Sequence, residues 1–283
     1  TSLADSGYVA QAHGAGKKVW GLVDNFTQDI STYEVLSRTS SRQNLVSQLV
    51  NAAVGAGIDG INVDFEQLSE DVGVHFLEFL RELSIECHKN NLVLSVDNPV
   101  PEDFTSHYDR AEQGKVVDYV IIMGYDEHNG SSLEAGSVSS YEFVKEGIEE
   151  TIKEVPAEKV INGIPFFTRL WSETPKTQEE LNQEAGTEAA DYPMKVTSEA
   201  LGMSTARDKI SQAGAETTLD ETTGNNYATW EADGVTYEIW LEDATSIEPK
   251  LQLMKENKLA GTAAWALGQE SSDIWDLILK YVN

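Results

Sequence analysis

The sequence alternates short apolar runs with longer amphipathic segments, and this alternation constrains the fold more than any other feature. Such a pattern is typical of βα units, in which helices join parallel strands. We expect strands at the apolar runs, which are residues 17–25, 60–66, 92–98, 119–126, 160–167 and 261–267. We expect helices at 41–56, 71–89, 139–153, 246–258 and 272–282. The chain is therefore predicted to be an α/β protein built on a parallel sheet.

One region interrupts the alternation between the fifth expected strand and the last one. Residues 170–243 are acidic and rich in glycine and threonine. Their last part, NNYATWEADGVTYEIWLED, holds two β-prone stretches joined by Asp233-Gly234, a pair that favours a hairpin turn. We predict that 170–243 is an insertion with its own small antiparallel sheet, inside a single catalytic domain that covers 1–283.

The charge of the chain limits its partners. Acidic residues outnumber basic ones 48 to 20, which gives a formal charge of -28. A field of this sign repels phosphate backbones and anionic membrane surfaces. No apolar run approaches the roughly 18 residues of a membrane-spanning helix, and no leader pattern is visible. We expect neither nucleic acid nor a membrane as a partner.

The sequence carries no recognisable metal-binding pattern. The five histidines show no HxH or HExxH spacing, and Cys87 is the single cysteine. We interpret Cys87 as a small buried hydrophobe in a helix. No metal cofactor is predicted. A further reading, an acidic metal-dependent hydrolase, would draw its ligands from Asp24, Asp64, Asp97 and Asp126.

Polar residues gather where the expected strands end. They are Asp24, Asn25, Asp64, Glu66, Asp97, Asn98, Tyr125, Asp126 and Arg169. The carboxyl ends of the strands form the functional face of a (β/α)8 barrel or of an open α/β sheet. A single acid at such a place can instead cap a helix. Because the pattern recurs on five strands, a functional site explains it better.

The stretch GIDGINVDFE, residues 57–66, holds three of these acids close together. Alternate residues of a strand share a face, so Asn62, Asp64 and Glu66 are predicted to point together into the interior. Asp59 has the opposite parity, and we expect it to hydrogen-bond the turn that leads into the strand. Partial burial beside another anion would raise the pKa of Glu66, which suits a general acid. Asp64 lies too close to Glu66 to act across a sugar from it and is expected to stabilise or orient a group.

DGINVDFE resembles the DxxDxDxE signature of glycoside hydrolase family 18, the chitinase family, in the form of bacterial members related to spore-cortex and peptidoglycan N-acetylglucosaminidases. Other segments resemble the family in the same order, namely MGYD at 123–126, GIPFFTRLW at 163–171 and AAWALGQE at 263–270. The resemblance covers essentially the whole chain. It implies a TIM-type (β/α)8 barrel with the small α+β insertion before the last strand.

The resemblance also implies a substrate-assisted, retaining mechanism through an oxazolinium intermediate. Glu66 would act as acid and base, Asp64 would stabilise the acetamido group, and Tyr125 would hold the attacking carbonyl. The substrate would be a β-linked N-acetylglucosamine glycan, in peptidoglycan or chitin, and the protein would be secreted or associated with the envelope or spore. The alternative is a catalytically silent sugar-binding barrel, since the family includes lectin-like members. Those usually lack the glutamate.

Further residues are expected to bind the sugar. They are Asn62, Met123, Asp126, Trp265, Asp97, Arg169, Trp171 and Glu242. By resemblance Met123 and Asp126 line the subsite and Trp265 lies beneath the ring, where an indole face removes apolar area from water. Asp97 would either hold Tyr125 or cap the next helix. Trp171 and Trp240 would contact substrate at the rim.

Arg169 allows two readings. It would neutralise Asp126 or Glu242, or it would bind a polar substituent or carboxylate of the substrate. The sequence alone does not separate these readings.

Two features depart from the family pattern. Asn62 stands where most members have aspartate. An amide cannot share a proton with Asp64, so we expect Asp64 to stay anionic more readily, held by the Asn62 N–H. KKVWGLVDN resembles the third barrel strand, preceded by a loop and helix at 1–16, so the first two strands are expected to be absent. Because two open parallel edges favour aggregation, this predicts a piece of a longer chain or strands supplied from elsewhere.

Overall fold

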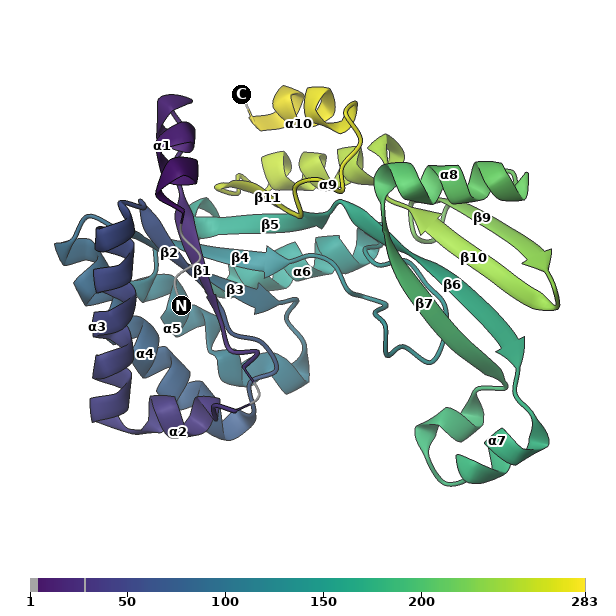
Figure 1. Ribbon diagram of the computed structural model, residues 1–283, viewed down its shortest axis with the longest axis horizontal. Helices are drawn as coiled ribbons and strands as arrows, with labels where there is room; N and C mark the ends of the chain where they lie inside the picture. Colours follow the sequence, from purple (N-terminus) through teal and green to yellow (C-terminus); the bar gives the residue numbers. More distant parts are fainter. Residues whose placement is uncertain (1–4, 28, 283) are drawn as a thin grey trace. The chain divides into compact units, whose positions relative to one another are not determined.

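The computed structural model describes residues 5–27 and 29–282, which form two compact units (Figure 1). The first unit contains residues 1–123 and 149–161, and the second contains 124–148 and 162–283. Helix α6 (Tyr141–Glu154) and strand β5 (Val160–Pro165) have residues in both units. A loop and helix were predicted at residues 1–16. Residues 1–4 of this segment lie outside the described residues, and the helix is α1 (Ser6–Gly14).

The first unit is built on a parallel sheet. Its strands are β1 (Trp20–Asp24), β2 (Gly60–Asp64), β3 (Val93–Pro99) and β4 (Tyr119–Met123), hydrogen-bonded in that order. The register places Asp24 beside Asp64, and Asn62 beside Ser95. Continued by one residue, the second of these registers brings Asp97 beside Asp64. The carboxyl ends of the strands therefore meet along one edge, as the sequence predicted.

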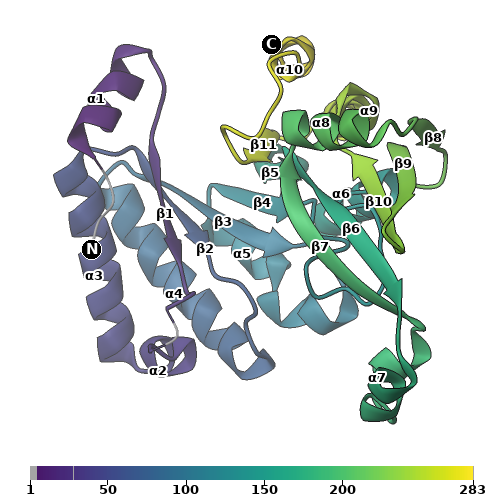
Figure 2. The same cartoon turned by 45° about the vertical axis from the view of Figure 1, so that its right-hand side comes forward.

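Helices cover one face of this sheet (Figure 2). They include α3 (Thr39–Ala56) and α4 (Glu70–Lys89), with the shorter α2 (Thr32–Ser37) and α5 (Arg110–Val116). Phe65, which directly follows β2, stacks on Phe76 and Phe79 of α4 at centroid distances of 5.7 and 5.6 Å. All three rings are buried. Burial of each such side chain contributes about 1.5–3 kcal/mol to the stability of the fold. The odd-numbered residues of the motif therefore anchor the strand in the core, and the even-numbered residues on the opposite face are available for chemistry.

The second unit contains an antiparallel sheet of five strands. They are β6 (Phe167–Pro175), β7 (Met194–Gly202), β8 (Thr218–Asp220), β9 (Asn225–Ala232) and β10 (Val235–Leu241), in the order β7-β6-β10-β9-β8. The predicted hairpin is confirmed: Ala232 pairs with Val235, and Asp233 and Gly234 turn with φ of 53° and 77°. Helix α8 (Met203–Ala213) packs on this sheet through Ala206 and Ile210.

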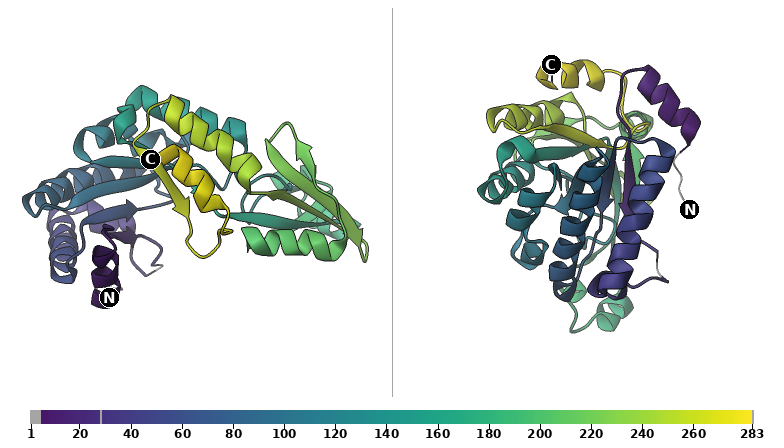
Figure 3. Two further views of the ribbon diagram at one scale, coloured as in Figure 1. Left: turned by 90° about the horizontal axis from the view of Figure 1, so that it is seen from above. Right: turned by 90° about the vertical axis from the view of Figure 1, so that its left-hand side faces the viewer.

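The C-terminal segment of the chain completes the second unit. Strand β11 (Gly261–Trp265) lies next to β5, and the Thr262 hydroxyl donates to the Asn162 carbonyl at 2.9 Å. Helices α9 (Ala244–Glu256) and α10 (Ile274–Val282) lie side by side (Figure 3). They share a buried cluster with Ile164 and Phe166. The short helix α7 (Gln178–Gln183) lies between β6 and β7 in the chain.

The expected fold class is confirmed as an α/β partial barrel of parallel strands with an antiparallel insertion before the last strand. The six expected strands and five expected helices all form, although most strands are shorter than their apolar runs. The sequence did not predict the β6–β7 hairpin, α2, α5, α7 or α8. Within residues 5–19 no strand precedes β1. No helix of the described residues has the length and apolar character to cross a bilayer.

Candidate active site

Strand β2 brings the central acids to the carboxyl edge of the parallel sheet. Asn62 and Asp64 are buried within the strand, with 9% and 7% of their surface exposed. Glu66 follows the strand by two residues and is partly buried. The strand therefore presents one acid at depth and one nearer to solvent, as the alternation in the motif predicted.

The Asn62 side chain points to the neighbouring strand. Its Nδ2 donates to Ser95 Oγ at 3.0 Å and to Asp97 Oδ1 at 2.8 Å. A side-chain amide has two N–H hydrogens, so none is left for Asp64. The prediction that Asn62 holds Asp64 is therefore wrong. Residues two apart on a strand are separated by about 6.6 Å, whereas adjacent strands lie only about 4.8 Å apart.

One oxygen of the buried Asp64 carboxyl group has no hydrogen-bond donor among the described residues. Burial, and then the charge of Asp24, raise the pKa of the Asp64 carboxyl. The oxygen without a donor is Oδ1, and it is buried from water. Burial removes water from the carboxylate, which explains the rise. That asparagine rather than aspartate at position 62 keeps Asp64 anionic more readily stays a prediction.

Asp97 is the third acid of this edge. Burial raises the pKa of Asp97 to about 7, the hydrogen bond from Asn62 opposes the rise, and the charges of Asp64 and Glu66 add to it. The protonation of Asp97 therefore depends on the charges of Asp64 and Glu66. Asp97 does not cap the next helix, since Glu102 caps the 3-10 turn at Asp103–Tyr108.

The backbone of Glu66 is clamped by Asn25, which follows β1. The Glu66 N–H donates to Asn25 Oδ1 at 2.9 Å, and Asn25 Nδ2 donates to the Glu66 carbonyl at 3.0 Å. Tyr108 supports the next turn, because its hydroxyl accepts from the Leu68 N–H at 3.4 Å. Sequence reasoning placed Asn25 only among polar residues at strand ends. The two partners are 41 residues apart, and no local pattern links them.

Two other polar residues of the sheet are structural. Asp59 accepts hydrogen bonds from the Val19 N–H at 2.7 Å and from His13 at 2.9 Å, and the first of these bonds lowers its pKa. It thus ties the start of β2 to the segment before β1, which confirms its structural role. The buried Asn98 side chain donates to Gln113 at 2.7 Å.

The second unit holds the other predicted site residues. Tyr125 packs edge-on against Phe167, with ring centroids 6.1 Å apart, and Asp126 has a φ of 62°. Arg169 on β6 donates to Ser198 at 3.1 Å, and its charge lowers the pKa of Asp126 against the larger effect of desolvation. The prediction that Arg169 neutralises Asp126 is therefore supported. Met123, in the first unit, is the last residue of β4 and is partly buried.

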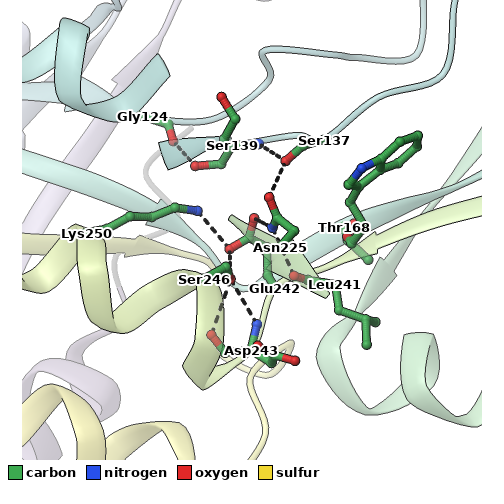
Figure 4. Close-up of polar contacts among 12 residues, drawn as sticks. Gly124, Ser137, Ser139, Thr168, Asn225, Leu241, Glu242, Asp243, Ser246 and Lys250 are labelled. Atoms are coloured by element: carbon green, nitrogen blue, oxygen red, sulfur yellow. Dashed lines mark hydrogen bonds and ion pairs between the residues drawn. The ribbon is translucent and has the colours of Figure 1, made fainter. Parts of the chain in front are cut away.

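Glu242 belongs to a buried network rather than to a sugar site (Figure 4). Its side chain is 0% exposed, and Lys250 Nζ lies 2.9 Å from Oε2. Ser246 and Asn225 donate to the same carboxylate at 2.8 and 3.0 Å. The predictions that Glu242 binds substrate or pairs with Arg169 are wrong, because the chain turns from β10 into α9 and Lys250, two helical turns along, points back at the carboxylate.

The tryptophans have different environments. Trp171 is 1% exposed, and its Nε1 donates to the Gly136 carbonyl at 2.8 Å, so the prediction that it contacts substrate is wrong. Trp240 is partly buried and donates to Asp220 at 2.9 Å. Trp265, at the end of β11, is 48% exposed, and the peptide bond that follows it is cis. Of these three rings, Trp265 has the most surface available for a ligand.

The structure describes residues 5–27 and 29–282. In that part of the chain, no group of three or more His, Cys, Asp or Glu side chains is arranged to hold a metal ion.

Comparison with protein families gives a match over most of the chain. The model described as glycosyl hydrolases family 18 matches residues 22–270. The uncharacterized glycosylase YvbX of Bacillus subtilis is 26% identical over 276 residues, which are 93% of this chain and 74% of that protein. The cortical fragment-lytic enzyme of the same organism is 26% identical over 257 residues, 88% of this chain and 56% of that enzyme. The chain thus spans little more than half of this relative.

Solved structures share the fold. A chitinase from Chromobacterium violaceum superimposes with a TM-score of 0.84 at 25% identity, covering 98% of this chain and 84% of that one. The spore cortex-lytic enzyme SleL of Bacillus cereus superimposes with a TM-score of 0.85 at 21% identity, covering 100% of this chain and 64% of that one. Together with the parallel strands joined by helices, these likenesses confirm the TIM-type architecture.

Proposed function

Because this chain belongs to the glycosyl hydrolases of family 18, we propose that it is a retaining glycosidase that cleaves β-linked N-acetylglucosamine glycans. One observation carries the proposal: Asp64 ends β2 and Glu66 follows two residues later, with its backbone clamped by Asn25. Two carboxyl groups so close along one strand do not suit attack from opposite sides of a sugar. They suit one proton carrier and one stabilising carboxylate.

In the proposed mechanism, the substrate supplies the nucleophile. Its acetamido oxygen attacks the anomeric carbon, the glycosidic bond breaks, and the leaving oxygen takes the proton of Glu66. The acetamido N–H is held by Asp64, whose negative charge stabilises the positive charge of the oxazolinium. Glu66 then removes a proton from the water that attacks the anomeric carbon from the face of the departed group. The two displacements give net retention.

The further sugar contacts are assigned on the resemblance to the family. We assign to Tyr125 the contact with the attacking carbonyl, and to Met123 and Asp126 the lining of the subsite. Trp265 would stack beneath the sugar ring, and its half-exposed indole supports this role. Arg169 would hold Asp126 in position.

Relatives named cortical fragment-lytic enzyme, spore cortex-lytic enzyme and chitinase support peptidoglycan or a chitin-like glycan as the substrate. They also support an envelope- or spore-associated place of action.

The test is digestion of purified peptidoglycan and of chitin oligomers by wild type and Glu66→Gln, with products identified by mass spectrometry. Loss of a general acid lowers the rate by about 10²–10⁴-fold, and we expect a loss of this size for Glu66→Gln. The matched control is Glu70→Gln at the exposed start of α4, which should cleave like wild type. A Glu66→Gln variant as active as wild type would make the assignment wrong. The preferred substrate is the one that wild type cleaves faster.

A further inference from the structure

Asp64 and Asp97 form a carboxyl pair across strands β2 and β3. The register pairs Val63 with Val96, and its continuation by one residue places Asp64 beside Asp97. The hydrogen bond from Asn62 to Asp97 places these two side chains on the same face of the sheet, which Asp64 shares with Asn62 by the alternation of the strand. In-register residues of neighbouring strands are about 4.8 Å apart. Two anions at this separation in a partly buried place would repel each other strongly.

The hydrogen-bond donors around the pair do not suffice for two anions. Both N–H hydrogens of Asn62 are used, on Ser95 and on one oxygen of Asp97. Asp64 Oδ1 is buried from water and has no donor among the described residues. A neutral carboxylic acid carries one O–H donor. A proton on Asp97 Oδ2 would therefore supply what Asp64 lacks.

We propose that Asp97 is a positioning residue that retains a proton and donates it as a hydrogen bond to Asp64, which fixes the Asp64 carboxylate for its task. The catalytic meaning of this role rests on the proposed function, because Asp64 is the group assigned to the acetamido N–H. The structural part of the inference concerns only the carboxyl pair and Asn62.

The charges around Asp97 favour this arrangement. From β2, the anions of Asp64 and Glu66 face Asp97, and burial together with these charges raises the pKa of Asp97 to about 7. From β1, the charge of Asp24 acts on Asp64 in the same direction. On β4, the residue in register with Asp97 is the apolar Ile121. Near neutrality the proton leaves Asp97, and Asp64 then loses a donor and gains a neighbouring anion.

The test uses Asp97→Asn, whose amide mimics the protonated acid at every pH. Its oxygen accepts from Asn62, and its N–H donates to Asp64. For wild type we expect kcat to decline as Asp97 ionises. We expect Asp97→Asn to match wild type at mildly acidic pH and not to show this decline. Asp97→Ala removes the donor altogether, and loss of one hydrogen bond to a charged group predicts a kcat about 10- to 100-fold lower at every pH.

Two controls separate positioning from simple charge removal. Asp24→Asn also removes a negative charge beside Asp64 but leaves Asp97 unchanged. The fall of kcat at alkaline pH should therefore be the same in Asp24→Asn as in wild type. A wild-type alkaline limb in Asp97→Asn, or the same shift in Asp24→Asn, would overturn the proposal.

A second measurement needs no turnover. In a carbon-13 NMR titration of the aspartate carboxyl groups, we expect the Asp97 signal to titrate near neutrality and the Asp64 signal to respond with the same midpoint. The response of Asp64 should vanish in Asp97→Asn. An Asp97 that ionises at an ordinary aspartate pKa, or an Asp64 that does not respond, contradicts the proposal. If the shared titration is present but Glu66→Gln cleaves like wild type, the glycosidase assignment fails and the carboxyl pair stands.

Discussion

The side-chain amide of Asn62 donates a hydrogen bond of 2.8 Å across the sheet to Asp97 and none along its own strand to Asp64. This relationship changes the meaning of the asparagine in the motif. It does not replace an acid partner of Asp64. It donates instead to Asp97 on the next strand. A substitution at position 62 is therefore expected to act by changing the hydrogen bonding and the pKa of Asp97.

Replacing Asn62 by aspartate is expected to move the alkaline limb of the pH–rate profile. The change removes the donor that lowers the pKa of Asp97 and adds a fourth carboxyl group beside Asp64, Glu66 and Asp97. Loss of one hydrogen bond to a charged group is worth about 1.5–3 kcal/mol, or about 1–2 pH units. We expect kcat/KM of Asn62→Asp to fall at a correspondingly higher pH. Superimposable profiles would contradict this, and Asn182→Asp, exposed on α7, is the matched control.

The pKa of Asp97 predicts a stability difference that depends on pH. The carboxyl has a pKa of about 7 in the folded protein and about 3.9 in the unfolded chain. Wild type therefore loses free energy of unfolding as the pH rises from about 4 to about 7, and the loss is constant above that range. Asp97→Asn does not titrate, so it should be more stable than wild type at alkaline pH by on the order of 2–4 kcal/mol.

Urea unfolding of wild type and Asp97→Asn on the two sides of this range measures the difference. We expect the two curves to approach each other at acidic pH and to separate at alkaline pH. An equal difference at both values would show that Asp97 does not titrate in this range. Asp24→Asn, which removes a more exposed acid of the same row, should change stability much less between the two values.

The Asn25 clamp predicts a loss of rate that exceeds its structural cost. Asn25→Ala removes both hydrogen bonds to the Glu66 backbone, and we expect a lower kcat, an almost unchanged KM and a free energy of unfolding lower by about 1–3 kcal/mol. The control is Asn226→Ala, which also removes two hydrogen bonds, to Asp243 and Thr245. Equal losses of kcat in the two variants would mean that the clamp is merely structural.

The buried pair of Glu242 and Lys250 predicts non-additive stability changes. Lys250→Met leaves a carboxylate without its cation in a place where the Glu242 side chain is 0% exposed, and breaking a buried pair on one side costs about 3–5 kcal/mol. The double variant Glu242→Gln/Lys250→Met should recover most of this loss. Thermal or urea unfolding of the two single variants and the double variant gives the coupling energy. Strict additivity would mean that the two groups act independently.

Two tryptophans should separate packing from ligand binding. Trp171 is 1% exposed and Trp265 is 48% exposed. Trp171→Ala is expected to lower the free energy of unfolding by about 3–5 kcal/mol. Trp265→Ala should lower it by less than about 1 kcal/mol and should instead raise KM for the glycan. Urea unfolding and steady-state kinetics of both variants measure the two effects. A wild-type KM in Trp265→Ala would show that Trp265 does not bind the sugar.

Local patterns predicted the elements well because they act over short stretches. The alternation at 60–66 predicted β2 and the inward acids, and the Asp233-Gly234 pair predicted the β9–β10 hairpin. The start of the insertion sheet was not predicted, since β6 begins at Phe167, inside an apolar run that was assigned to the preceding strand. A single apolar run contains no signal for where a parallel strand ends and an antiparallel one begins.

The partners of site residues could not be predicted in the same way. Asn25 meets Glu66 across 41 residues, and Ser137 meets Asn225 across 88. Arg169 and Glu242 looked like ion-pair partners in an acidic chain with few bases, but Lys250 occupies the place beside Glu242. Trp171 was predicted to contact substrate at the rim of the site, but its indole N–H donates to the Gly136 carbonyl inside the core.

By itself, the sequence determined the alternation of strands and helices, the edge of the sheet that carries polar residues and the family to which DGINVDFE belongs, because periodicity and motif spacing are properties of neighbouring residues. Only the tertiary structure decided which carboxyl groups share an environment. The parallel register of β2 and β3, continued by one residue beyond Val63 and Val96, places Asp97 beside Asp64, and Asp97 lies within hydrogen-bond reach of Asn62. The distance between strands is shorter than the distance between alternate residues of one strand, so hydrogen bonds and pKa values in this site follow the sheet and not the motif.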